Sequence, residues 1–374
     1  MELPRQYKAQ LGCEWNRAAS FTRHPFQLEN RIECGLSQLG EEHSDTSHFL
    51  GRHSTMSHLI DKRRVWRRIP YLRENEGRAP PLVLAVGDRR RVFSIARKLK
   101  KTVLLPETVA RLSGQKDPRS APMFGRVAMA IGLVSSSVPV LVVETQMGAP
   151  ATQIIMNEIL SDELTSTAYR VGKSRIDLPC KIAIRVGTAG GINCDGKPAI
   201  EVGDIVNATH SIGASGAVIQ SLLRLDFWSS GAMEEFQKRW IELGPDFTIT
   251  IEGHPRVDCS REVVEALDDA GRRLVTNAYH RGGNITKDSL YAELSDDVFL
   301  DLCHEQNCRS TEMELSAIAV SARKNNAHFG MISAIVGVLP GASFTESEKA
   351  KTLAEQRSLR VALEAVKNLA SRES

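Results

Sequence analysis

The run KIAIRVGTAGG at residues 181–191 constrains the fold of this chain more than any other segment. Three apolar residues lead into Arg185, and small residues follow it. An apolar run without alternation is typical of a strand that is covered on both faces, as in the sheet of an α/β protein. We therefore predict a buried strand that ends at Arg185 and a glycine-rich turn over residues 187–191.

The side chains at the end of this predicted strand have the chemistry of an anion site. A guanidinium such as that of Arg185 can donate two hydrogen bonds to one oxyanion, and Thr188 adds a hydroxyl. Glycines allow backbone N–H groups to approach the same ligand. This set favours phosphate, and the alternative is a surface arginine beside an ordinary glycine turn.

Alternating strand and helix patterns begin at residue 80 and define the fold class. Apolar runs predict strands at 81–86, 126–134, 138–145, 203–209, 247–251 and 331–338, and helical spacing predicts helices at 89–98, 263–278 and 312–324. This alternation predicts a three-layer α/β/α domain around a mixed central β-sheet.

The composition of the chain changes near residue 78. Residues 1–78 mix charges of both signs with few sustained apolar runs, and the regular pattern begins directly after them. We predict that residues 1–78 are a partly disordered N-terminal extension and that residues 79–374 form the folded domain.

Composition and charge argue against several kinds of partner. The chain of 374 residues has a net charge of +3, which gives no sign of a nucleic-acid partner. No apolar run approaches the ~20 residues of a membrane span, so we expect no membrane partner. Seven scattered cysteines favour reduced thiols and a cytoplasmic location. Cys303, His304 and Cys308 could begin a metal site, but no second ligand pair at zinc spacing follows, so no metal is expected.

Three glycine-bearing loops are expected at the carboxyl ends of predicted strands, where ligands of open α/β sheets bind. These loops are residues 87–91, 145–148 and 185–188. The first leads into a helix N-terminus, which attracts anions, and it places Arg91 in the first helical turn. None of the loops contains a dinucleotide fingerprint or a P-loop. Two arginines, a threonine and loop amides indicate inorganic phosphate as a reactant, and no cofactor is expected.

A second group of candidate residues is the sequence Thr311-Glu312-Met313-Glu314, at the predicted start of an amphipathic helix. Two carboxylates in the first turn could simply complement the helix dipole. The alternative is that Glu314 accepts hydrogen bonds from the vicinal hydroxyls of a ribose while Met313 packs on the sugar.

Together these motifs resemble nucleoside phosphorylases of the uridine phosphorylase type. The resemblance covers about residues 80–368, and its motifs follow the family's order: Gly87-Asp88 with Arg91, Thr145-Gln146-Met147-Gly148, the run from Arg185 to Gly191, Val202-Gly203-Asp204, and Glu312-Met313-Glu314. It implies a mixed sheet flanked by helices, in a homodimer that can build a hexamer. It also implies phosphorolysis of a ribonucleoside, uridine first, to free base and ribose 1-phosphate, with nucleoside and phosphate as the partners.

The resemblance implies a role for each matching residue. Arg91 and Arg185 take the catalytic role. Phosphate is bound by Gly87, Arg91, Arg185 and Thr188, the ribose by Thr145, Met313 and Glu314 with support from Glu312, and the base by Gly190, Tyr291 and Asp296.

The positions that read the base differ from those of the family. Uridine phosphorylases place an aromatic residue, a glutamine and an arginine there, whereas this chain has Leu290, Leu294 and Asp296. Purine phosphorylases carry an aspartate after the late strand, where residues 336–340 contain no acid. A purine or methylthioadenosine-type phosphorylase or nucleosidase, and a catalytically silent nucleoside- or phosphate-binding protein, remain alternatives. The arginine pair favours phosphorolysis, because a hydrolytic nucleosidase has no need of it.

Overall fold

The computed structural model describes residues 73–104, 127–135, 137–194, 196–288, 297–339 and 347–372. These residues all belong to one compact unit, which spans Arg52–Ser374. The predicted domain boundary at residue 78 stays a prediction, because nearly all of the chain before it lies outside the described residues.

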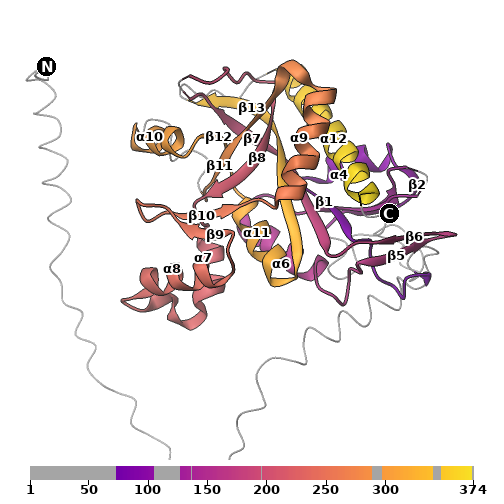
Figure 1. Ribbon diagram of the computed structural model, residues 1–374, viewed down its shortest axis with the longest axis horizontal. Helices are drawn as coiled ribbons and strands as arrows, with labels where there is room; N and C mark the ends of the chain where they lie inside the picture. Colours follow the sequence, from indigo (N-terminus) through magenta and orange to yellow (C-terminus); the bar gives the residue numbers. More distant parts are fainter. Residues whose placement is uncertain are drawn as a thin grey trace, which may run out of the picture. The chain divides into compact units, whose positions relative to one another are not determined.

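A large mixed β-sheet forms the centre of this unit (Figure 1). Its strands are β1 (Leu82–Val86), β2 (Lys100–Leu104), β3 (Met129–Leu133), β4 (Pro139–Glu144), β7 (Lys181–Ile192), β8 (Ile205–Ile212), β9 (Phe247–Ile249), β10 (Pro255–Asp258), β11 (Tyr279–Thr286), β12 (Cys308–Glu312) and β13 (Ala327–Leu339). They follow the order β2-β3-β4-β1-β7-β12-β11-β8-β10-β9, and β13 pairs with both β7 and β8. This double pairing closes β7, β12, β11, β8 and β13 into a ring. The strands β5 (Ala168–Val171) and β6 (Ser174–Asp177) form a separate hairpin.

The central strands bury both of their faces. In β1, Leu82, Leu84 and Val86 pack into one hydrophobic cluster, while Val83 and Ala85 pack into the other. Successive side chains of a strand point to opposite faces, so a strand between two helical layers must be apolar at every position. The pattern of residues 81–86 therefore predicted this strand correctly.

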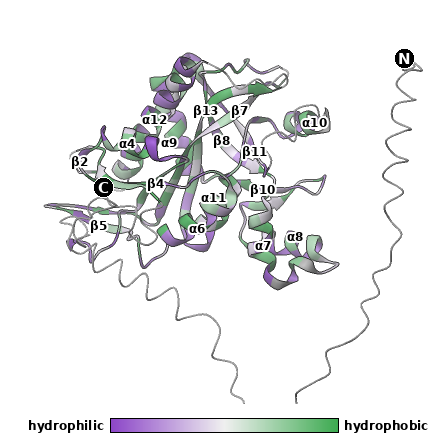
Figure 2. Ribbon diagram, turned by 180° about the vertical axis from the view of Figure 1, so that it is seen from behind, coloured by the Kyte–Doolittle hydropathy of each residue, from purple (hydrophilic) through white to green (hydrophobic). Residues whose placement is uncertain are grey.

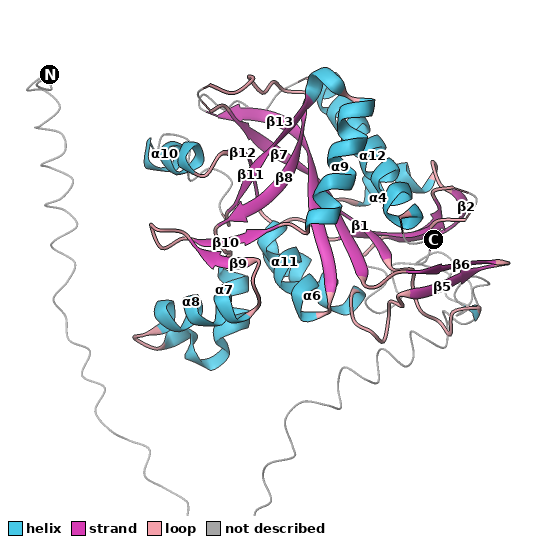
Figure 3. Cartoon of the chain, viewed as in Figure 1, coloured by secondary structure: helices cyan, strands magenta, loops and turns pink. Residues whose placement is uncertain are grey.

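Helices cover the sheet on both faces and form the two outer layers (Figure 3). One face packs against α4 (Arg89–Ala96), α9 (Arg261–Leu274) and α12 (Glu348–Ser371), and the other packs against α6 (Ala149–Ile159), α7 (Gly216–Leu223), α8 (Ala232–Glu242) and α11 (Leu315–Lys324). The remaining helix is α10 (Asp297–Glu305), and the short 3-10 helices are η4 (Arg224–Trp228) and η5 (Thr276–Ala278). Figure 2 shows α6 and α11 in front of the sheet when it is seen from behind. The predicted α/β class with a mixed central sheet is confirmed.

The length and hydrophobicity of a helix decide whether it could cross a membrane. None of the described helices is both long enough and apolar enough to cross a bilayer. Even α12, the longest at 24 residues, is amphipathic, with one side buried on the sheet and charged residues on the other.

The predicted turn over residues 187–191 is wrong, because β7 continues as a strand to Ile192. Strand β13 pairs with β7 in parallel along its whole length, and β12 pairs with it at Gly190 and Gly191. The glycines serve close packing: a Cβ atom on Gly191 would lie 2.7 Å from Ile200 Cγ2. Small residues here thus permit tight side-chain packing within a strand.

Candidate active site

A cavity of about 380 Å³ lies where β1, β4 and β7 meet the connection between β12 and α11. Most of the predicted site residues line it: Gly87, Arg91, Arg185, Thr188, Gly190, Glu312, Met313 and Glu314. The three predicted loops do converge, although the third is part of a strand. Two predicted base-binding residues, Tyr291 and Asp296, lie outside the described residues.

Arg185 is the best-fixed side chain of the site. It is buried on β7, and its guanidinium donates from Nη1 to Thr145 Oγ1 at 3.0 Å and from Nη2 to Glu314 Oε2 at 2.8 Å. Its buried Nε makes no hydrogen bond to any described residue. Two bonds on the outer nitrogens hold the guanidinium plane in one orientation.

Two glycines make room for this guanidinium, Gly87 directly after β1 and Gly187 within β7. A Cβ atom on Gly87 would lie 3.3 Å from Arg185 Nη2 and 3.7 Å from Arg91 Nη1. A Cβ atom on Gly187 would lie 3.2 Å from Arg185 Nε. The guanidinium groups of Arg91 and Arg185 therefore both approach Gly87, and this position concentrates positive charge.

Arg91 reaches the cavity from the first turn of α4. Asp88 caps this helix by accepting a bond from the Arg91 N–H at 3.1 Å. The Arg91 side chain pairs through Nη2 with Glu355 Oε1 of α12 at 2.7 Å and through Nε with Asp88 Oδ2 at 3.2 Å. An anion that binds beside Gly87 would have to compete with these two carboxylates for Arg91.

Thr145 lies behind Arg185, with its side chain fully buried. Its hydroxyl donates to the Val86 carbonyl at 3.1 Å and accepts from Arg185. Thr145 directly follows β4, so these two bonds link the ends of β1 and β4 and fix the orientation of the guanidinium. The predicted ribose contact of Thr145 stays a prediction.

Glu314 precedes α11 and is buried. Its Oε1 accepts a bond from the Gly148 N–H at 2.7 Å, and its Oε2 accepts from Arg185. Burial acts to raise the pKa of this carboxyl, but the charge of Arg185 and the Gly148 N–H outweigh it, so the pKa lies below its usual value. Glu314 is therefore an ionised acceptor at neutral pH.

Glu312 has a different position from the predicted one, because it ends β12 and α11 begins only at Leu315. Its Oε1 accepts from Asn284 Nδ2 at 2.8 Å and from Thr286 Oγ1 at 2.9 Å, and its Oε2 accepts from the N–H groups of Glu314 and Leu315. Burial and the neighbouring Glu314 carboxylate raise the pKa of Glu312 to about 7. Glu312 thus ties β11 and β12 to the N-terminus of α11 and fixes the position of Glu314.

The loop before α6 brings its backbone to the site. Gln146 and Gly148 have φ angles of 63° and 86°, in the left-handed region, and Gly148 caps α6. Glycine adopts such an angle readily, and at Gly148 the bond to Glu314 holds the backbone in place. Met147, between them, is 77% exposed at the cavity mouth.

Several further cavity residues have no role in the sequence-based prediction. Arg90, Lys351 and Lys287 bring further positive charge, and Val336 and Leu339 of β13 bring apolar surface. Lys287 directly follows β11, so the rule that ligands bind at carboxyl ends of strands would have found it had β11 been recognised. Among the described residues, no group of three or more histidines, cysteines or acids could hold a metal ion.

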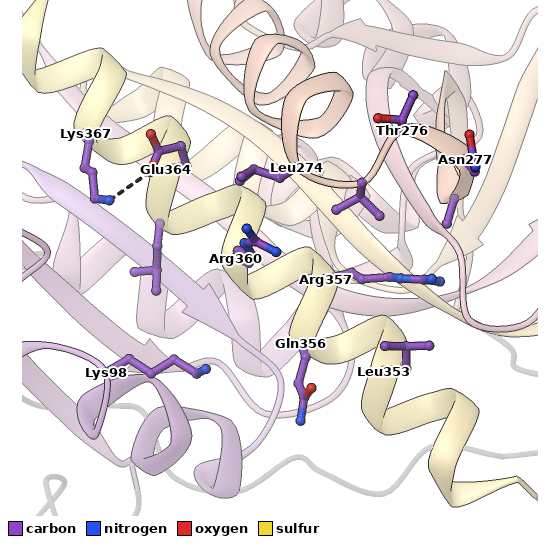
Figure 4. Close-up of a pocket in the computed structure, with 13 residues that line it drawn as sticks. Lys98, Leu274, Thr276, Asn277, Leu353, Gln356, Arg357, Arg360, Glu364 and Lys367 are labelled. Carbon is purple, nitrogen blue, oxygen red and sulfur yellow. Dashed lines mark hydrogen bonds and ion pairs between the residues drawn. The ribbon is translucent and has the colours of Figure 1, made fainter.

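A larger cavity of about 780 Å³ lies apart from these residues, between α12 and the end of α9 (Figure 4). Three of its charged side chains have structural partners: Arg357 donates to the Gly203 carbonyl, and Lys367 pairs with Glu364. It contains no buried pair of arginine and carboxylate like Arg185 and Glu314. The smaller cavity is therefore the candidate active site.

Comparison with known proteins agrees with this fold. The model of the phosphorylase superfamily matches residues 102–367, and the chain belongs to this superfamily. A solved purine nucleoside phosphorylase from Toxoplasma gondii, in complex with immucillin-H, is similar at 20% identity over 79% of this chain and 93% of its own, with a TM-score of 0.52. A uridine phosphorylase from Vibrio fischeri shares 17% identity over 78% of this chain and 92% of its own, with a TM-score of 0.49. No curated protein matches the chain.

Proposed function

We propose that this protein catalyses phosphorolysis of a ribonucleoside, with uridine as the first candidate, to free base and ribose 1-phosphate. One observation carries the proposal: Arg91 and Arg185 approach Gly87 in the cavity that also holds the buried carboxylate of Glu314. Membership of the phosphorylase superfamily supports it. The order of the sequence motifs resembles that of uridine phosphorylases and supports uridine as the substrate.

The arginine end of the cavity suits inorganic phosphate as a reactant. Two guanidinium groups provide forked donors that match phosphate oxygens, and the Thr188 hydroxyl lies on the same cavity wall. No cofactor enters this reaction, since phosphate itself is the co-substrate.

Glu314 suits the vicinal hydroxyls of a ribose. An ionised carboxylate accepts hydrogen bonds only, and each of its oxygens has capacity for more than the one bond it makes here. Met313 lines the cavity next to it and offers apolar surface to the sugar. Because Glu314 also accepts from Arg185, the ribose and the phosphate would bind in adjacent positions.

Adjacent binding explains how the reaction proceeds. As the C1′–N bond breaks, its electron pair stays with the base and positive charge develops on the ribosyl ring. A phosphate oxygen held by Arg91 and Arg185 stabilises that charge and forms the new bond to C1′, and the base then takes up a proton. Holding both reactants in one site removes the entropic cost of their encounter.

Purified full-length protein tests the proposal with uridine, inosine and methylthioadenosine, each with and without phosphate. We expect ribose 1-phosphate from at least uridine or inosine, only with phosphate. Arg185→Ala should lower kcat/KM by about 100-fold or more. Arg261→Ala, at an exposed position of α9, should have no effect and serves as the control. Absence of ribose 1-phosphate with every substrate would contradict the proposal, and phosphate-independent release of base would favour a nucleosidase.

The proposal also covers the oligomeric state of the protein and its location in the cell. We infer a homodimer or hexamer in the cytoplasm, on the resemblance to the family and on the scattered cysteines. Light scattering of the purified protein tests the assembly, and a mass equal to the single chain of 41.2 kDa would contradict it.

A further inference from the structure

Lys287 is a cavity residue to which the proposed reaction has so far given no role. It directly follows β11, and its N–H donates to the Glu312 carbonyl at 3.0 Å, so its backbone is tied to the acid that positions Glu314. Its side chain is half-buried and lines the same cavity as Arg185 and Glu314.

The cavity is long enough to separate Lys287 from the phosphate end. Strand β7 runs along it from Arg185 to Gly190, which at about 3.3 Å per residue is about 16 Å. Arg185 lies beside Gly87 at one end, whereas Gly190 pairs with Thr311 at the other. Lys287 is bonded to the residue after Thr311, so it belongs to the second end.

The other cavity cations belong to the first end. Arg90, Arg91 and Lys351 also line a neighbouring hollow that contains Glu355 of α12. Among the described residues of the cavity, Lys287 is thus the cation whose backbone is bonded at the end away from the arginine pair.

One wall of this end is apolar, while Thr311 and Glu312 line the cavity beside it. Val336, Gly337 and Leu339 of β13 line it, and Gly337 and Leu339 pair with Gly190 and Ile192 of β7. An apolar wall with a cation nearby suits a flat heteroaromatic ring that carries an oxygen atom at its edge.

We propose that Lys287 Nζ donates a hydrogen bond to a carbonyl oxygen on the ring of the departing base, and that it thereby selects bases with an oxo group over bases with an amino group at that position. This inference rests on the proposed phosphorolysis. It names the substrate class as oxo-substituted nucleosides, such as uridine or inosine, over amino-substituted ones, such as cytidine or adenosine.

The chemistry of an ammonium group explains both the preference for oxo bases and the stabilisation of the departing base. An ammonium donates hydrogen bonds and accepts none, so it meets an oxo group favourably and an exocyclic amino group unfavourably. When the C1′–N bond breaks, the electron pair on the base spreads to its carbonyl oxygens, and a cation there stabilises the negative charge. Burial lowers the pKa of Lys287 to about 8, which leaves the group mostly charged at neutral pH while making it a stronger donor.

Steady-state kinetics of full-length wild type, Lys287→Met and Lys287→Arg test the inference, with uridine, inosine, cytidine and adenosine in saturating phosphate. We expect Lys287→Met to lower kcat for the oxo nucleosides by about 100-fold and to bring the oxo-to-amino ratio of kcat/KM close to one. Lys287→Arg should keep most of the activity and the preference. The KM for phosphate should stay unchanged in both variants, because Lys287 lies at the other end of the cavity, and this readout separates a local effect from misfolding.

The possible failures are distinguishable. A wild type that forms no ribose 1-phosphate from any nucleoside would overturn the proposed function and this inference with it. An active wild type whose kcat and oxo-to-amino ratio are unchanged in Lys287→Met would overturn the inference alone. A Lys287→Met variant with a raised KM for phosphate and the original base preference would also overturn it.

Discussion

Arg185 and Glu314 form a buried ion pair, with Nη2 and Oε2 2.8 Å apart and side chains only 4% and 6% exposed. Each side chain has a second partner, Thr145 for the arginine and the Gly148 N–H for the carboxylate. The pair joins β7 to the start of α11 and to the loop before α6. The same two side chains thus hold the walls of the cavity together and present the groups that would bind phosphate and ribose.

We predict that the two sides of this pair are energetically coupled, so that losing both side chains costs less than the sum of losing each one. Arg185→Met or Glu314→Leu should each lower the free energy of unfolding by about 3 kcal/mol, since each leaves an unpaired buried charge. The double variant should lose clearly less than the sum of the two. Urea denaturation measures the free energy of unfolding of the two single variants and of the double variant. Arg261→Met, which breaks an exposed pair with Glu265, should leave the free energy of unfolding nearly unchanged. Strictly additive losses would show that the pair is not coupled as described.

We predict that Thr145 acts on phosphate through Arg185. Thr145→Val removes the acceptor of Nη1 and should raise the KM for phosphate about tenfold, which corresponds to one charge-assisted hydrogen bond. Thr145→Ser keeps the hydroxyl and should behave like the wild type. Initial rates at varied phosphate concentration measure this, and equal values for both variants would argue against the positioning role.

We predict that Gly87→Ala impairs phosphate binding with little loss of stability. The new Cβ would lie 3.3 Å from Arg185 Nη2, a tight contact that intrudes between the two guanidinium groups. Gly231→Ala is the matched control, because its Cβ would meet nothing closer than 3.5 Å and its φ is −100°. Phosphate titration by calorimetry should show weaker binding for the first variant only. Equal affinity in Gly87→Ala would mean that phosphate does not bind between these arginines.

We predict an alkaline limb in the pH profile that belongs to Lys287. The ammonium form is the active one, so kcat/KM for uridine or inosine should fall as the pH rises through about 8, the lowered pKa of this lysine. Among the described residues, the thiol of Cys303 on α10 is the titratable group that acts on it electrostatically. Burial raises the pKa of that thiol to about 12, so it stays neutral in this range. In Lys287→Arg the fall should move to higher pH, and an unmoved limb would assign it to another group.

Much of the fold follows from the sequence, because strands covered on both faces are apolar throughout. Strand β1 was predicted from this property, and the convergence of Gly87, Arg185 and Thr188 followed from the strand-end rule. The glycines of β7 led to the wrong prediction of a turn over residues 187–191. Glycine signals a turn locally, whereas the long pairing of β7 with β13 depends on residues far away in the chain.

Strand β12 could not have been found from hydrophobicity. Its residues, Cys308–Glu312, are mostly polar, yet all are buried. Several of their polar groups bond across the strands: Ser310 donates to Asn284, and Asn284 donates to Glu312. A buried strand with such a network has a polar sequence, so the acid pair was assigned to a helix instead.

The fate of isotopically labelled phosphate tests the central claim most directly. Wild-type protein would be incubated with uridine or inosine and phosphate that carries oxygen-18 at every position, and the sugar product analysed by mass spectrometry. Attack of phosphate on C1′ predicts ribose 1-phosphate that retains all of the labelled oxygen atoms of the phosphate, formed only when phosphate is present. Free ribose carrying a solvent oxygen atom, released at the same rate without phosphate, would contradict the account.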